Sequence, residues 1–134
     1  MNESEKIDLR ELSPLALAFV GDAVLELLVR ARLVGTTRLQ PNRLHTVATH
    51  YVSAHAQNLE LDIIEPMLTD AEAAVLRRGK NASKATVAKH ATVQEYRAST
   101  GFECLLGWLY LNGQLERVHQ LFEVLWQQFD PDQK

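Results

Sequence analysis

Acidic side chains inside strongly apolar segments are the residues of this sequence that could do chemistry. Asp22 lies within LALAFVGDAVLELLVR, and Glu103 lies within TGFECLLGWLYL. Glu26 follows Asp22 by four residues and therefore shares its helical face. An unpaired charge resists burial, so these positions need a cation beside them. If the two segments pack together, the carboxylates of Asp22 and Glu103 repel each other unless a divalent ion lies between them.

The donor types indicate which ion would serve. Carboxylate oxygens that leave room for several waters are typical of a Mg²⁺ site, with Mn²⁺ as an alternative, and not of a zinc site. A bound Mg²⁺ lowers the pKa of a coordinated water, aligns it with a phosphorus atom and neutralises charge on the leaving oxygen. Hydrolysis of a phosphodiester needs all three effects. Taken alone, the first segment also fits a plainer interpretation, in which Gly21 is a notch where two helices cross and Asp22 pairs with an arginine.

The segment RRGKNASK, residues 77–84, is a concentrated cationic stretch in a chain whose formal net charge is −3. Gly79 and Asn81 favour a turn, which predicts a protruding loop that presents its cations to the phosphates of a nucleic acid. The candidate binding residues are Arg77, Arg78, Lys80, Asn81 and Lys84. The plainer interpretation is a solvated helix end, where cations interact favourably with the C-terminal dipole.

Size and composition limit the class of protein. The chain has 134 residues, of which 46% are hydrophobic, so we expect one compact domain over residues 1–134 with an ordered core of about residues 12–128. The negative net charge offers no general attraction to nucleic acid, so such binding needs a local patch. A charged N-terminus and the lack of a membrane-length apolar run predict a cytoplasmic protein with no membrane partner. The single cysteine, Cys104, excludes an internal disulfide and is predicted to be buried.

Helix signals recur along the chain and no stretch alternates like a strand, which predicts an all-α fold. Ser13 is a good N-cap and Pro14 suits the first helical position, so the first helix starts there and runs to about residue 33. Gly35 breaks this pattern. A second helix is predicted from residue 41 to about residue 59, with Gln57 on its polar side.

Three more helices are predicted in the second half of the chain. The capping box Thr69 and Glu72 opens one helix, which Gly79 closes, and a long loop with at most one turn of helix follows to about residue 92. A very apolar helix spans residues 93–111 and ends at Asn112 and Gly113. The last helix, over residues 115–129, is amphipathic.

The helix over residues 93–111 is hydrophobic almost all round, so it belongs at the centre of the bundle. Gly101 and Gly107 flank Glu103 and would permit a neighbouring helix to approach closely. The first helix carries more apolar residues than one packed stripe needs, among them Leu15, Phe19 and Val20. This surplus predicts that a second copy of the chain buries part of that helix across a two-fold axis.

These segments resemble a known family. LALAFVGDAVLELLVR is similar to the signature helix of the ribonuclease III catalytic domain, and TGFECLLGWLYL is similar to its second acidic helix. RRGKNASK and YRASTGFE resemble two further stretches of the bacterial Mini-ribonuclease III branch, so the resemblance covers about residues 13–128.

The resemblance implies an all-α ribonuclease III-like domain that forms a two-fold homodimer. It implies a Mg²⁺-dependent endoribonuclease that cuts double-stranded RNA to 5′-phosphate and 3′-hydroxyl ends during maturation of the 23S ribosomal RNA precursor. Asp22 matches the signature aspartate and Glu103 the metal-binding glutamate. Glu26 matches a glutamate of the Mini branch, as a partner of the metal shell or of the dimer interface. We expect no double-stranded RNA-binding domain, since 134 residues leave no room for one, and this agrees with the Mini branch.

The sequence departs from full-length ribonuclease III at two positions. Where those enzymes carry an acid one turn before each metal ligand, this chain has Ala18 and Thr100, which suggests more water around the metal. The departure keeps a second hypothesis open, a non-catalytic RNA-binding or ribosome-associated protein on the same fold. A third hypothesis is a helical interaction module with no nucleic-acid role.

Overall fold

The computed structural model describes residues 8–83 and 91–132, and all regular structure in these two ranges is helical, which confirms the all-α prediction. The α-helices are α1 (Pro14–Thr36), α2 (Pro41–Val52), α3 (Ala54–Ile64), α4 (Asp70–Ala82), α5 (Val93–Leu111) and α6 (Leu115–Gln128). Short 3₁₀ turns, η2 (Leu9–Glu11) and η3 (Glu65–Met67), precede α1 and α4. Lys84 lies outside the described residues.

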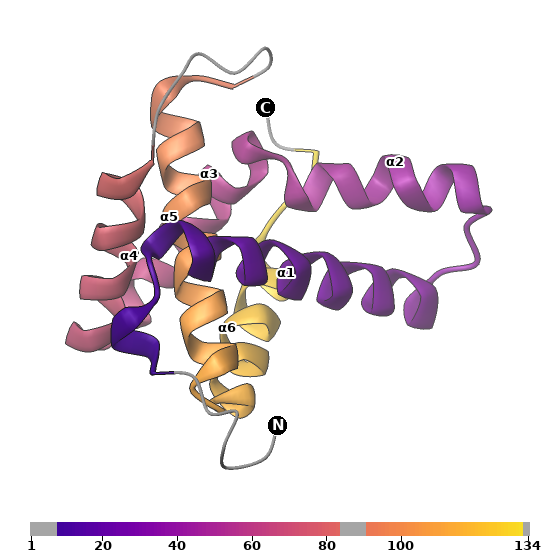
Figure 1. The fold of residues 1–134 in the computed structure, drawn as a ribbon. Helices are drawn as coiled ribbons and strands as arrows, with labels where there is room; N and C mark the ends of the chain where they lie inside the picture. Colours follow the sequence, from indigo (N-terminus) through magenta and orange to yellow (C-terminus); the bar gives the residue numbers. More distant parts are fainter. Residues whose placement is uncertain (1–7, 84–90, 133–134) are drawn as a thin grey trace.

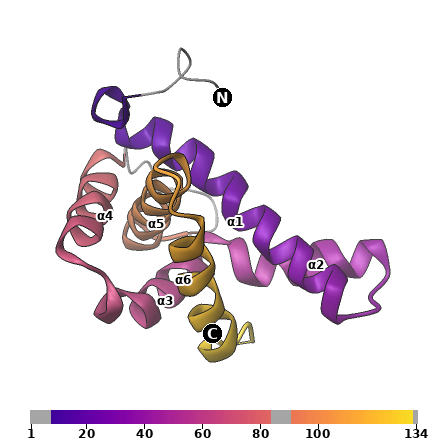
Figure 2. The same ribbon diagram turned by 90° about the horizontal axis from the view of Figure 1, so that it is seen from below.

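Helix α5 is the centre of the bundle, as its apolar sequence predicts (Figure 1). It packs against α1, α3, α4 and α6, and its side chains Phe102, Leu105 and Leu109 are completely buried. Helix α1 crosses α5 near its own N-terminal half, and its C-terminal half runs beside α2 to form an arm that projects from the bundle (Figures 1 and 2). The crossing of α1 and α5 sets the position of the predicted acidic residues.

The helix starts follow the predicted caps. The Ser13 hydroxyl accepts a hydrogen bond from the Ala16 amide at the start of α1. Thr69 and Glu72 form the predicted capping box of α4, in which each side chain accepts from the other residue's backbone amide. Because these caps satisfy amides that a helix leaves unpaired, they fix where α1 and α4 begin.

Two predicted helix ends are wrong, and both involve glycine. Helix α1 continues through Gly35, and the hydroxyl of Thr36 donates back to the Arg32 carbonyl. Helix α4 continues through Gly79 to Ala82, so the cationic residues at 77–82 lie on a helix and not on the predicted loop. Gly79 is a packing position, because a Cβ there would lie 2.6 Å from Cys104 Cβ. Cys104 is buried as predicted.

The predicted single helix over residues 41–59 is also wrong, because the chain breaks at Ser53. The Ser53 amide donates to the Thr49 carbonyl and ends α2, while its hydroxyl accepts from the Ala56 amide and starts α3. The break resets the helical phase, so Gln57 enters the core and not the polar side predicted for it.

A partly buried ion pair connects helix α6 to the rest of the bundle. Arg117 donates to both carboxylate oxygens of Glu72, each at 2.8 Å, and to the Met67 carbonyl at 2.7 Å. The Arg117 guanidinium lowers the pKa of Glu72. Within the described ranges, no helix is both long and apolar enough to cross a membrane.

Candidate divalent-metal site

Glycine brings the backbones of α1 and α5 into direct contact. A Cβ built on Gly21 would lie 1.7 Å from the Glu103 carbonyl oxygen, and one built on Gly107 would lie 1.9 Å from the Leu17 carbonyl oxygen. Any side chain at either position would overlap the opposite backbone. The glycine notches predicted at 21 and 107 therefore face each other, whereas Gly101 faces α4.

This contact brings Asp22 and Glu103 together. Asp22 is exposed on α1, and Glu103 is partly buried on α5. Burial raises the pKa of Glu103 well above its usual value, and the neighbouring charge of Asp22 and a hydrogen bond to Asp22 raise it further. Glu103 therefore binds a proton readily when no cation is present, since its carboxylate is removed from water and lies beside another acidic group.

Glu26 lies on the same helix face and is held by its own helix. Arg30 Nε donates to Glu26 Oε2 at 3.0 Å, and the Glu26 charge adds to the raised pKa of Glu103. Glu26 thus contributes negative potential to the site while Arg30 directs its carboxylate.

The donor set fits a hard divalent ion that keeps part of its water shell. The acidic groups that meet here, Asp22, Glu26 and Glu103, are all carboxylates, which are oxygen donors. Among residues 8–83 and 91–132, no three His, Cys, Asp or Glu side chains are grouped tightly enough to enclose an ion. The remaining positions would have to come from water or from a substrate.

Gln57 of α3 reaches the same carboxylate, and we did not predict it. Its Nε2 donates to Glu103 Oε2 at 3.0 Å and to the Val52 carbonyl at 2.9 Å. Only the break at Ser53 turns Gln57 inward, and the sequence signal for that break was weak, since Ser53 lies within a continuous helical pattern. Ser53 is a residue type that often caps a helix. A helix started there would place Gln57 on its apolar face, and this signal could have predicted the break.

Glu60, one turn beyond Gln57, is a second buried acid that the sequence pattern did not reveal. Its side chain is 0% exposed, and no donor among the described residues reaches either carboxylate oxygen. Burial raises the pKa of Glu60 to about 9, so this carboxyl group is neutral at pH 7. It is therefore not equivalent to Glu103, which is only partly buried and contacts Gln57.

Ala18 and Thr100, which stand where full-length ribonuclease III enzymes carry acidic residues, are packed within the protein. Ala18 belongs to a small apolar cluster with Val75 and Cys104. The Thr100 hydroxyl donates to the Tyr96 carbonyl at 3.0 Å. Neither position offers a carboxylate to an ion.

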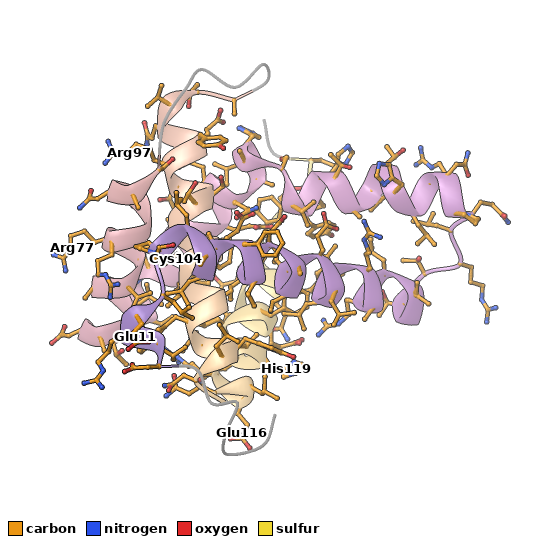
Figure 3. All side chains as sticks on the ribbon, in the orientation of Figure 1. Glu11, Arg77, Arg97, Cys104, Glu116 and His119 are labelled. Atoms are coloured by element: carbon orange, nitrogen blue, oxygen red, sulfur yellow. The ribbon has the colours of Figure 1, made fainter. Side chains whose placement is uncertain are left out.

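The predicted cationic residues that the structure describes lie along the outer side of α4. Arg77 and Arg78 are exposed, and Arg77 points away from the bundle (Figure 3). Lys80 pairs with Glu65 at 3.3 Å, and Asn81 accepts a hydrogen bond from Arg97. Arg97 also projects from this edge (Figure 3), so it extends the cationic surface that the sequence assigns to residues 77–84.

Comparison with known proteins supplies the family. A profile of the ribonuclease III domain matches residues 15–114. The chain is 47% identical over 116 residues to Mini-ribonuclease 3 of Enterococcus faecalis, covering 85% of this chain and 88% of the relative. It is 41% identical over 127 residues to Mini-ribonuclease 3 of Staphylococcus aureus, covering 93% and 95%.

The fold agrees with these matches. A crystal structure of a protein from Fusobacterium nucleatum superposes with a TM-score of 0.81 at 28% sequence identity, over 90% of this chain and 96% of that one. The chain belongs to the ribonuclease III family of endoribonucleases, and within it to the Mini-ribonuclease 3 proteins.

Proposed function

We propose that this chain is a Mg²⁺-dependent endoribonuclease that cuts double-stranded RNA as a homodimer. The observation that carries the proposal is the glycine-lined crossing of α1 and α5, which holds Asp22 and Glu103 side by side. In this proposal Asp22 and Glu103 hold the metal ion, and Mn²⁺ can replace Mg²⁺. The bound ion supplies a water of lowered pKa and charge neutralisation at the leaving oxygen.

The protein's own residues prepare this site. Arg30 directs the Glu26 carboxylate, whose negative charge favours a cation beside Glu103. Asp22 is exposed, so one ligand of the pair opens to a substrate while Glu103 is held within the protein. An ion that replaces the proton of Glu103 offsets the burial and the repulsion that together raise the pKa of this residue.

In the same proposal, the outer side of α4 binds the RNA backbone. Arg77 and Arg78 present exposed guanidinium groups to phosphates, and Lys80 and Asn81 border them. Contacts to phosphate orient a duplex without reading its sequence, so the shape of the duplex would matter more than its bases. Lys84 is assigned to this surface from the sequence alone.

A second copy of the chain would cover the exposed apolar stripe of α1. Leu15, Phe19, Ala23 and Leu27 recur every four residues and are all exposed, and the Phe19 side chain is 83% exposed. Exposed apolar groups of this size on one helix face favour association. A two-fold pair would place two metal sites on one duplex, as paired cleavage of both strands requires. We propose the 23S ribosomal RNA precursor as the substrate, by resemblance to the Mini-ribonuclease III branch.

The function is tested by incubating the purified protein with duplex RNA with and without Mg²⁺. We expect Mg²⁺-dependent products with 5′-phosphate and 3′-hydroxyl ends, no products from Asp22→Asn, and unchanged RNA binding by that variant. Glu116→Gln is the control, because it removes one negative charge from the first turn of α6, which lies apart from Arg77 in Figure 3. Tight duplex binding without products would instead support a non-catalytic RNA-binding protein.

A further inference from the structure

Gln57 is a polar side chain inside the core. It is 1% exposed and lies in the first turn of α3, on the same buried face as Ala56 and Leu61. A buried amide is costly unless its hydrogen bonds are made, so its partners indicate why it is there.

Both amide hydrogens of Gln57 are used, whereas its Oε1 is buried and has no partner among the described residues. One goes to the carbonyl of Val52, the last residue of α2, and the other goes to Glu103 Oε2. A helix leaves its final carbonyls without partners, and the break at Ser53 exposes the Val52 carbonyl to this side chain. The reverse orientation of the amide would put its oxygen against two acceptors, so the nitrogen must face Val52 and Glu103.

The contact therefore ties a proposed metal ligand to a fixed piece of backbone. Glu103 is the carboxylate on α5, and Gln57 connects it to the α2–α3 corner, which does not otherwise belong to the site. With Oε2 held, the Glu103 carboxylate cannot rotate freely, and its orientation toward Asp22 is set before any ion binds. Residues that fix a metal ligand in this way typically change metal affinity or activity ten- to a hundredfold when they are replaced.

We propose that Gln57 is a positioning residue for the metal site, acting through the Glu103 carboxylate and anchored by the Val52 carbonyl. The inference rests on the proposed function, because it gives Glu103 the role of a metal ligand. It adds a third helix, α3, to a site that the sequence places on α1 and α5.

The test is Gln57→Met, which keeps the length and much of the volume of the side chain but has no donor. We expect kcat on duplex RNA to fall ten- to a hundredfold, with KM for RNA within about twofold of wild type. Calorimetric titration of the RNA-free protein with Mn²⁺ should give an affinity at least about tenfold weaker. These two readouts separate positioning of a ligand from a general loss of structure.

The matched control is Ile64→Val, which removes one buried methylene from the same helix without touching Glu103. It should lower thermal stability but leave kcat and Mn²⁺ affinity unchanged. If Gln57→Met does not fold, Gln57→Asn serves with the same readouts, since its amide is one methylene too short to reach Glu103.

Wild-type kcat and Mn²⁺ affinity in a folded Gln57 variant would overturn the inference. A variant in which only KM for RNA rises, with kcat and Mn²⁺ affinity unchanged, would overturn it as well. A wild-type protein that neither binds Mn²⁺ nor cuts duplex RNA would instead overturn the proposed function. The two failures are therefore distinguishable.

Discussion

Glu60 places a carboxyl group in the interior with no donor from the described residues, and its burial has a consequence for pH dependence. The folded protein keeps this group protonated up to about pH 9, whereas the unfolded chain ionises it near 4.5. The unfolded state therefore binds fewer protons between these two pH values, and the free energy of unfolding must fall as the pH rises.

Glu60→Gln should flatten this dependence, because the amide is similar in shape and does not ionise. Glu60 alone makes the free energy of unfolding fall by up to about 1.4 kcal/mol per pH unit. Urea denaturation at pH 5, 6.5 and 8 in the absence of divalent ions measures how the free energy of unfolding changes with pH. Glu103 contributes with the same sign and remains in the variant, so a shallower slope is expected, not a flat one. Equal slopes in wild type and variant would contradict the buried, neutral state of Glu60, and Asp62→Asn, an exposed acid on the same helix, is the control.

The sequence was sufficient to predict that Asp22 and Glu103 come together, because an acid in an apolar segment near glycine is an unusual local pattern. It was not sufficient to select Gln57 or Glu60. Both lie beyond the break at Ser53, and a helix continued without that break puts Gln57 on the polar side. The error in helical phase thus concealed Gln57, whereas Glu60 lies beyond the end that the sequence predicts for that helix.

At the level of elements, the separation of α1 and α5 depends on two glycines. Gly21 and Gly107 each lie against the opposite backbone, so α1 and α5 approach more closely than helices with side chains at the crossing. Gly35 lies in the same helix as Gly21, but a Cβ added to it would meet no other part of the described chain within 4 Å. The two α1 glycines therefore form a matched pair for experiment.

Gly21→Ala should separate the helices, destabilise the protein by at least about 3 kcal/mol and abolish cleavage. Gly35→Ala should raise the free energy of unfolding by up to about 1 kcal/mol, because alanine is the better helix former and meets no obstacle. Denaturant unfolding and a cleavage assay on both variants measure these effects. Equal stability of the two alanine variants would mean that the crossing does not depend on the notch.

Helix starts were predictable and several helix ends were not. Ser13 and the capping box of Thr69 and Glu72 are local signals, and hydrogen bonds within one turn confirm them. The ends predicted at Gly35 and Gly79 failed because a glycine within a helix is not always a stop. Gly79 faces Gly101 across the contact of α4 and α5, a role that depends on residues distant in sequence.

At the level of the whole molecule, the exposed stripe on α1 bears on assembly. Phe19 is 83% exposed within one subunit, so its replacement should not disturb the subunit's own core. The all-α class and the central position of α5 followed from apolar patterning. The proposed pairing of two subunits rests on a surface that the sequence marks only as a surplus of apolar residues.

Phe19→Glu should convert the protein to a monomer with an unchanged melting temperature for the subunit and strongly reduced cleavage of duplex RNA. Analytical ultracentrifugation at micromolar concentration measures the state of association. Leu115→Glu, which alters an exposed apolar residue at the start of α6, should leave the dimer intact. A wild-type protein that sediments as a monomer, or a Phe19→Glu variant that sediments as a dimer, would refute the assigned interface.

The central proposal is that Asp22 and Glu103 coordinate the same divalent ion. Anomalous scattering from crystals grown with Mn²⁺ in place of Mg²⁺ tests it most directly. We expect one anomalous peak per subunit at the crossing of α1 and α5, within bonding distance of both carboxylates, and no peak there in Asp22→Asn. A Mn²⁺ ion bound elsewhere, or an empty crossing at saturating Mn²⁺, would contradict the assignment.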